Sequence, residues 1–212
     1  MYKATKSLNI KSIFDLIRLL VRKIRIWHVY VTLLIPLLLL TSDLLSGQLG
    51  VDPMRELEKS LGVTGIYILI LTLCITPLST LTAINFIRFR RAFGLMSFFY
   101  IALHFSTWIL LDMQLRWYEI VESVTKKPFI VFGMMGFLLL IPLAATSNNY
   151  SIKRLGKYWP KLHKLIYVAI ILGGVHYLMM EKTLQNDAIT TFIIILVLIL
   201  LRFFKLRKIN WL

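Results

Sequence analysis

Residues 63–81 read VTGIYILILTLCITPLSTL, a stretch without a single charged side chain. As an α-helix it would rise about 28 Å, close to the roughly 30 Å thickness of the hydrocarbon core of a bilayer. Because backbone groups in lipid must find hydrogen-bond partners within their own segment, the stretch is expected to be a helix rather than a strand. Five further apolar runs, each bounded by charges, proline or polar clusters, lie at 27–45, 93–111, 128–146, 162–180 and 188–204. The sequence predicts an all-α, polytopic membrane protein, a single bundle with six transmembrane helices.

The overall composition points the same way. Of the 212 residues, 58% are hydrophobic and only 17% are charged, and the mean hydropathy is +0.76. These values exclude a water-soluble enzyme. The single cysteine, Cys74, excludes an intramolecular disulfide and a cysteine-rich metal cluster. The chain also has no Cys-x-x-Cys-His motif, which excludes covalently attached haem.

The basic residues are divided unevenly between the two sides of the predicted bundle. Eighteen of the 25 Lys and Arg residues fall on the side of the two chain ends, and six fall on the opposite side. By the positive-inside rule, both termini are expected to be cytoplasmic. Nine of the 10 acidic residues, all but Asp15, then lie on or near the far side. The net charge of +15 therefore indicates orientation in the bilayer rather than binding of nucleic acid, which would need a folded soluble module.

Three regions are expected along the chain. Residues 1–26 alternate apolar and basic side chains, which is typical of an amphipathic helix on the anionic cytoplasmic leaflet, although a solvated flexible tail is an equally good interpretation. The transmembrane domain covers 27–204, and a basic cytoplasmic tail covers 205–212. The first apolar run is too long for the core of a signal peptide and lacks a small-residue cleavage site, so we expect it to be a retained span.

Two histidines lie within predicted spans, where an ionisable residue is energetically costly. His104 lies in FFYIALHFSTW and His176 in LGGVHYLMM. Both spans run from the cytoplasm outward, so the two side chains enter the outer half of the bundle and could face each other across a ligand. No carboxylate, cysteine or second close histidine accompanies either of them to form a zinc or di-iron site. Two neutral imidazoles are, however, a sufficient pair of axial ligands for one haem.

A haem held in this way has both axial positions of its iron occupied, which favours electron transfer over oxygen binding. Other interpretations remain open on the residues alone. A lone intramembrane histidine more often forms hydrogen bonds across helices. A small proton-coupled transporter would use His104 and His176 as protonation sites, and a structural or assembly factor would need neither; both alternatives predict a colourless protein.

Glycines in these spans allow another group to approach the backbone closely. Gly173 lies three residues before His176 on the same helical face, so a flat macrocycle could approach the chain there. The alternative is plain helix packing, which is also the expectation for Gly133 and Gly136 in the fourth span.

His163 stands at the inner end of the span that carries His176. The 13-residue interval between them corresponds to a helical rise of about 19.5 Å, which suggests a second, inner haem. The two side chains would lie about 140° apart around an ideal helix, so a common seam requires a bend or a bulge. Arg91 stands 13 residues before His104, where a symmetrical two-haem bundle would have another histidine. Arg91 and the two arginines before it suit the carboxylates of an inner haem, or simply anchor the cytoplasmic side.

Several motifs, taken in order, resemble the MsrQ (YedZ) family. They are LGVDPMRELEKSLGVTG before the second span, LCITPL within it, RFRRAFGLMSFFYIALHF opening the third, and LAATSNNYSIKRLGKYWPKLHKLIYVA across the fourth and fifth, followed by His176. The combination of DP, ITPL, RRxxGL, TS, RLGxxW and LHxLxY is highly specific. The similarity runs from about residue 46 to residue 180, whereas 1–45 and 181–212 match only as hydrophobic and basic segments.

The resemblance implies the haem-binding subunit of a bacterial methionine sulfoxide reductase system, a ferric-reductase-like bundle in the inner membrane. Such a subunit takes electrons from the quinone pool or from a cytosolic flavin reductase. It passes them to a separate catalytic partner, a periplasmic molybdopterin-dependent reductase that repairs oxidised periplasmic proteins. Carried over by motif, His104 and His176 are the outer ligands of a b haem, and His163 is the candidate ligand of a second. The family is also associated with FMN, for which this sequence identifies no site.

Overall fold

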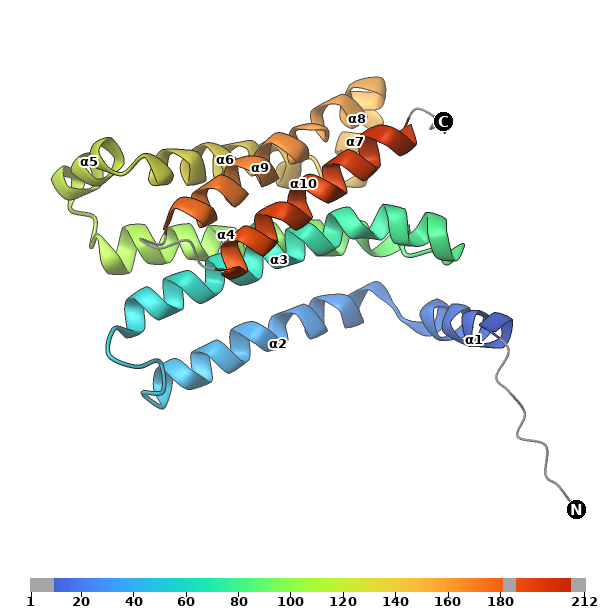
Figure 1. The fold of residues 1–212 in the computed structure, drawn as a ribbon, viewed down its shortest axis with the longest axis horizontal. Helices are drawn as coiled ribbons and strands as arrows, with labels where there is room; N and C mark the ends of the chain where they lie inside the picture. The colour runs from blue at the N-terminus through green and yellow to red at the C-terminus, as the bar shows by residue number, and fades with distance from the viewer. Residues whose placement is uncertain (1–9, 181–185, 207–212) are drawn as a thin grey trace, which may run out of the picture.

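The computed structural model describes residues 10–180 and 186–206, and every regular element within these residues is a helix. The long helices lie side by side in one elongated bundle (Figure 1). The predicted all-α class is therefore confirmed. Residues 1–9 of the predicted N-terminal segment and 207–212 of the predicted basic tail lie outside the described residues.

Short connections join the helices in chain order. The elements are α1 (Ile10–Lys23), α2 (Ile26–Leu45), α3 (Pro53–Thr82), η1 (Ile87–Phe89), α4 (Arg90–Thr107), the π-helical turn η2 (Trp108–Asp112), α5 (Trp117–Lys126), α6 (Pro128–Ala145), α7 (Asn149–Leu155), η3 (Gly156–Tyr158), α8 (Trp159–Leu162), α9 (Leu165–Met180) and α10 (Asn186–Leu206). In Figure 1, α1, α7, α8 and the last turns of α10 lie at one end of the bundle, the α7 end. The other end, with α5 and the loop between α2 and α3, is called the α5 end.

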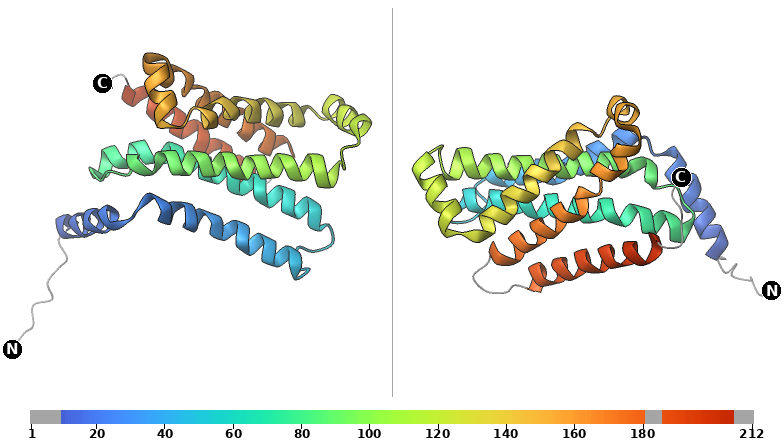
Figure 2. Two further views of the ribbon diagram at one scale, coloured as in Figure 1. Left: turned by 180° about the vertical axis from the view of Figure 1, so that it is seen from behind. Right: turned by 90° about the horizontal axis from the view of Figure 1, so that it is seen from above.

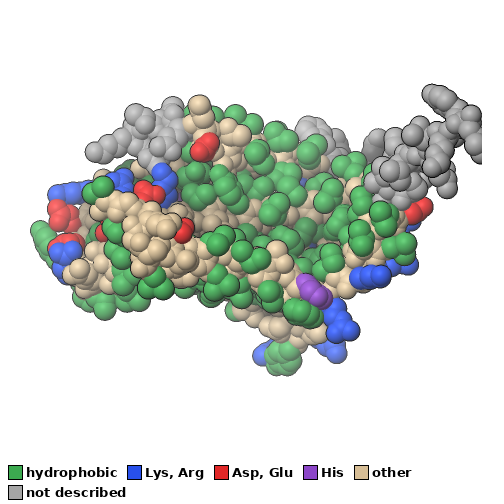
Figure 3. Space-filling view, turned by 90° about the horizontal axis from the view of Figure 1, so that it is seen from below, with side chains coloured by type: hydrophobic (Ala, Val, Ile, Leu, Met, Phe, Trp, Pro, Cys, Tyr) green, Lys and Arg blue, Asp and Glu red, His purple; other side chains and the backbone are tan. Residues whose placement is uncertain are grey.

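Four helical segments of the described chain are long and apolar enough to cross a membrane, namely α2, α3, the stretch Ile87–Asp112 and α6. A fifth candidate is the pair Asn149–Leu162 and Leu165–Met180, which is bent by 51°. The helix α10 packs against α9 and α3 and is seen beside α9 in Figure 2. The face shown in Figure 3 is largely hydrophobic, with Lys and Arg gathered towards its ends. The chain is a polytopic membrane protein with four or five candidate spans, while the number six and the orientation of the termini stay predictions.

The predicted fifth span, 162–180, is not one continuous helix. A turn at His163 and Lys164 separates α8 from α9. The indole N–H of Trp159 donates a hydrogen bond to the backbone oxygen of Thr146 (2.9 Å), which holds α8 against the end of α6. The helical rise and the angle expected between His163 and the other histidine of this span therefore do not apply across the turn.

The helix α3 begins at Pro53, well before the predicted second span. Asp52 caps it by accepting a hydrogen bond from the N–H of Arg55 (3.2 Å), and proline at the first helical position has no N–H to leave unpaired. Hydropathy does not reveal these first turns because they carry charges. They bring Glu58 and Gly62 to the site described below.

The helix predicted in the N-terminal segment is present as α1, and several of its apolar side chains are exposed. Its last turns pack on the bundle through Val21, which is buried with Ile84 and Phe89. The guanidinium of Arg88 donates hydrogen bonds to the backbone oxygens of Val21 and Ile24. Carbonyls at the end of a helix have no helical partners, so this arginine satisfies two of them.

Tyr100 ties α2 to the rest of the bundle. Its fully buried side chain donates a hydrogen bond to the backbone oxygen of Leu33 (2.7 Å) and accepts one from the N–H of Leu37 (3.0 Å). In a regular helix those two backbone groups would bond to each other. Pro36 lies within this turn, where it lacks an N–H and crowds the preceding turn, and the Tyr100 hydroxyl bridges the two backbone groups.

Replacing Tyr100 with Phe is expected to lower the free energy of unfolding by about 1–3 kcal/mol, because two backbone groups lose their partner away from water. Reversible unfolding in mixed detergent micelles measures this change. Tyr118→Phe is the matched control, since the Tyr118 side chain is exposed and its loss should leave the unfolding free energy unchanged. Equal stability of the two variants would show that the hydroxyl bridge does not hold α2.

Candidate functional site

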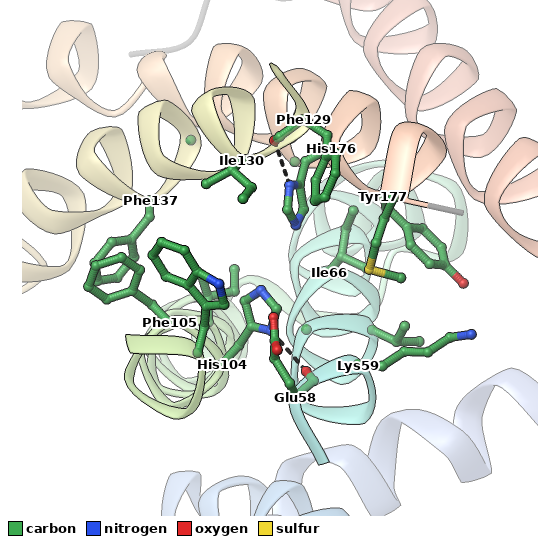
Figure 4. Close-up of a pocket in the computed structure, with 18 of the residues that line it drawn as sticks. Glu58, Lys59, Ile66, His104, Phe105, Phe129, Ile130, Phe137, His176 and Tyr177 are labelled. Carbon is green, nitrogen blue, oxygen red and sulfur yellow. Dashed lines mark hydrogen bonds between the residues drawn. The ribbon is translucent and has the colours of Figure 1, made fainter. Parts of the chain in front are cut away.

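His104 of α4 and His176 of α9 point towards one another inside the bundle (Figure 4). Their ring centroids are 6.0 Å apart and the ring planes are inclined by 70°. Nδ1 of His104 lies 2.8 Å from the backbone oxygen of Glu58, and Nδ1 of His176 lies 2.7 Å from that of Phe129. A carbonyl oxygen only accepts, so each Nδ1 carries a proton, and in a neutral ring this tautomer leaves a free lone pair on Nε2.

A cavity of about 820 Å³ surrounds the two rings. Pockets that hold cofactors and other small molecules usually measure about 300–1,000 Å³. Phe105 and Phe137 lie on one side of the histidine pair, and Ile66 and Tyr177 lie on the other (Figure 4). At the α5 end the lining becomes charged, with Asp52, Arg55, Glu56, Glu58, Lys59, Asp112 and Lys127. The lining of the cavity is therefore apolar around the histidines and charged towards the α5 end.

The geometry of the pair fits a haem. Imidazole nitrogen binds a first-row metal at about 2.0 Å, so two rings that share one metal have centroids roughly 6 Å apart. In the described part of the chain, no group of three or more His, Cys, Asp or Glu side chains is placed to hold a bare metal ion. A metal that arrives within a flat macrocycle needs only the two axial ligands that are present here, and the aromatic and aliphatic walls suit such a macrocycle.

Gly173, predicted to face a macrocycle, also lines this cavity. A Cβ built on Gly173 would meet one atom, Cδ1 of Ile66, at 3.9 Å, an ordinary contact distance. Neighbouring protein atoms therefore do not require glycine at this position. The predicted contact between Gly173 and a cofactor is compatible with the space in front of it and stays a prediction.

The structure places His163 away from this cavity, at the α7 end. Its Nε2 lies 3.2 Å from the hydroxyl oxygen of Thr146, and its ring stacks on Trp159 with centroids 4.0 Å apart. The Thr146 hydroxyl also donates to the backbone oxygen of Pro142 (2.6 Å). No second histidine joins His163 within the described residues. Its assignment as the ligand of an inner haem stays a prediction.

Arg91 also lies outside the cavity. Its guanidinium is exposed and donates a hydrogen bond to the side-chain oxygen of Asn149 (2.8 Å), which links the start of α4 to the start of α7. The structure does not bring Arg91 to the histidine pair. Its predicted role at an inner cofactor remains without support from the contacts of its side chain.

Two groups that hold the histidines could not be identified from residue types. They are the backbone carbonyls of Glu58 and Phe129, which bind Nδ1 of His104 and His176. A backbone oxygen leaves no mark in the sequence. The one available signal is general, since a neutral histidine buried as a ligand needs an acceptor for its second nitrogen.

Comparison with known proteins places this arrangement in a family. Residues 61–174, which run from α3 into α9, match the family described as ferric reductase like transmembrane component. The protein-methionine-sulfoxide reductase heme-binding subunit MsrQ of Brucella anthropi is 44% identical over 159 residues, which cover 75% of this chain and 72% of that protein. The subunits of the same name from Brucella ovis and Brucella canis are 44% identical over 157 residues, 74% of this chain and 71% of theirs. The chain, with its two facing histidines on α4 and α9, thus belongs to the MsrQ family of ferric-reductase-like transmembrane proteins.

Proposed function

We propose that the chain binds a b haem between His104 and His176 and acts as the membrane electron-transfer subunit of a methionine sulfoxide reductase system. The observation that carries this proposal is the pair of imidazoles whose unprotonated nitrogens face each other with ring centroids 6.0 Å apart. The relatives support it, because their name describes a heme-binding subunit of a protein-methionine-sulfoxide reductase.

Each residue of the site has a defined part in this proposal. His104 and His176 would hold the iron through Nε2, and their Nδ1–H bonds to Glu58 and Phe129 fix the tautomer that leaves Nε2 free. The aromatic and aliphatic walls keep water from the site and lower the local dielectric constant, which influences a reduction potential. A bound haem with two imidazole ligands supplies one-electron oxidation and reduction at its iron.

The location of the cavity suggests the direction of electron flow. Its charged lining residues lie at the α5 end, which the charge distribution predicts to be the outer side of a bacterial inner membrane. A haem there lies close to a periplasmic molybdopterin-dependent partner, the proposed acceptor. The proposed donors, the quinone pool or a cytosolic flavin reductase, act from the membrane or from the α7 end. A second haem at His163 and an FMN site belong to the same proposal.

An absorption spectrum of the purified protein tests the proposal. After reduction with dithionite we expect the sharp visible bands of a six-coordinate low-spin haem, because both axial positions are occupied. Haem content per polypeptide then gives the number of haems, and a value above one requires a second site such as His163. A colourless protein that transports protons or a solute would instead support the transporter alternative and contradict the assignment of the histidine pair.

A further inference from the structure

Each histidine of the site lies directly against a glycine of the neighbouring helix. A Cβ built on Gly62 of α3 would lie 3.0 Å from Nδ1 and 3.2 Å from Cε1 of His104. A Cβ built on Gly133 of α6 would lie 2.7 Å from Nδ1 and 2.9 Å from Cε1 of His176. Side chains essentially never approach a Cβ closer than 3.0 Å. The His176 ring could therefore not keep its place beside an alanine, and the His104 ring would be crowded.

The hydrogen bond of each ring uses the same helical turn as the glycine. Nδ1 of His104 bonds to the carbonyl four residues before Gly62, and Nδ1 of His176 bonds to the carbonyl four residues before Gly133. In an α-helix such a carbonyl already accepts the N–H of the residue four positions later, which here is the glycine itself. The imidazole must reach the second lone pair across the face of that glycine. The missing Cβ leaves this path open.

The two helix pairs repeat one arrangement. Three residues after the first glycine, each helix carries a second one, Gly65 in α3 and Gly136 in α6. A Cβ on Gly65 would meet Cγ1 of Ile101 at 2.7 Å, and a Cβ on Gly136 would meet the backbone O of Ala169 at 3.3 Å and the backbone N of Gly173 at 3.5 Å. Ile101 and Gly173 each lie three residues before the site histidine of their own helix. In both pairs, α3–α4 and α6–α9, a histidine of one helix thus packs on a glycine of its neighbour, and a second glycine follows three residues later. No repeat is evident in the sequence.

We infer that Gly62 and Gly133 are positioning residues that fix the ring planes and the Nδ1–H tautomer of His104 and His176 before any cofactor binds. The inference rests on the proposed function and adds the origin of the ligand geometry. It assigns the 70° angle between the ring planes to two helix backbones rather than to the iron. It also revises the expectation for Gly133, whose place against His176 is more than plain helix packing.

Substitution of the two glycines by alanine tests the inference in the haem-loaded full-length protein. In Gly133→Ala we expect the haem affinity to fall by roughly 10–100-fold, the range found when a group supporting a metal ligand is lost. Oxidised low-spin haem with nearly perpendicular imidazole planes gives a highly anisotropic EPR signal, and the signal of the haem that remains should move to a different largest g value. Its reduction potential should become more positive, because a ring without its Nδ1 hydrogen bond is a weaker base. Gly62→Ala should shift the same quantities in the same direction but less, since its contacts are longer.

A matched control separates positioning from folding. Gly94→Ala changes the helix that carries His104, but its Cβ would meet only Cγ2 of Thr72 at 3.7 Å, so all three readouts should stay at wild-type values. Alanine is also a better helix former than glycine, so loss of helix cannot explain an effect at Gly62 or Gly133. If the wild-type protein shows six-coordinate haem and both variants retain its affinity, EPR signal and potential, the inference is wrong while the proposed function stands. A wild-type protein without haem would overturn the proposed function itself.

Discussion

Replacing either His104 or His176 with alanine is expected to remove the six-coordinate haem spectrum from the purified protein. Each imidazole supplies one of two axial bonds, and in the structure the two rings come from different helices with centroids 6.0 Å apart. A haem held from one side would be five-coordinate and would exchange with free haem in detergent. We expect haem content to fall at least about tenfold, the lower bound for loss of a group that supports metal binding.

Two further variants sharpen this experiment. His28→Ala should leave the spectrum unchanged, because His28 is exposed on α2 and stacks on Trp27 away from the cavity. His176→Met should keep a six-coordinate haem with a raised reduction potential, as is typical of Met/His ligation. If both alanine variants kept a wild-type spectrum, the haem would have to be ligated elsewhere, and His163 would be the first residue to examine.

The bundle and the histidine pair were accessible from sequence because both depend on side-chain type along helices. Uncharged runs such as 63–81 identify helices that can lie in lipid. Two intramembrane histidines on helices running in the same direction are then expected at a similar depth, and the structure indeed brings His104 and His176 together in one cavity. Hydropathy does not report where a helix starts outside the lipid, so it does not predict the early start of α3 at Pro53.

The details that position the site depend on contacts between helices, which a hydropathy pattern does not encode. Tyr100 reads as one apolar residue among many, yet its hydroxyl bridges a disturbed turn of α2. The break at His163 follows α8, which Trp159 holds against the end of α6 through a hydrogen bond to the backbone of Thr146, and hydropathy does not encode such a bond. A glycine that only allows close helix packing and a glycine that contacts an imidazole ring cannot be told apart in sequence. Gly62 and Gly133 are therefore distinguished from packing glycines only by the structure.

Replacing Gly65 with Leu is expected to prevent α3 and α4 from packing and to have the largest effect on stability. Gly65 is buried, and a Cβ there would lie 2.7 Å from Cγ1 and 3.3 Å from the backbone N of Ile101. The Ile101 side chain can rotate away from a methyl group, but the backbone of α4 cannot yield to a leucine without moving the helix. The backbone oxygen of Gly65 also accepts a hydrogen bond (2.8 Å) from the hydroxyl of Ser97, which is fully buried.

Separation of the two helices would therefore add the loss of a buried hydrogen bond to the overpacking, a combined cost of about 3 kcal/mol or more. Reversible unfolding in mixed micelles, or the yield of monodisperse protein where unfolding is not reversible, measures this cost. Tyr67→Leu, two residues further along α3 on an exposed face, is the control for adding leucine to this helix and should unfold like the wild type.

Because α4 carries His104, Gly65→Leu should lower haem content in proportion to the loss of folded protein. Gly133→Ala is expected to lower haem content while the fold is retained. In a plot of haem content against stability, the Gly133 and Gly65 variants should therefore fall on different lines. Coincident behaviour of both variants would mean that Gly133, like Gly65, acts only through helix packing.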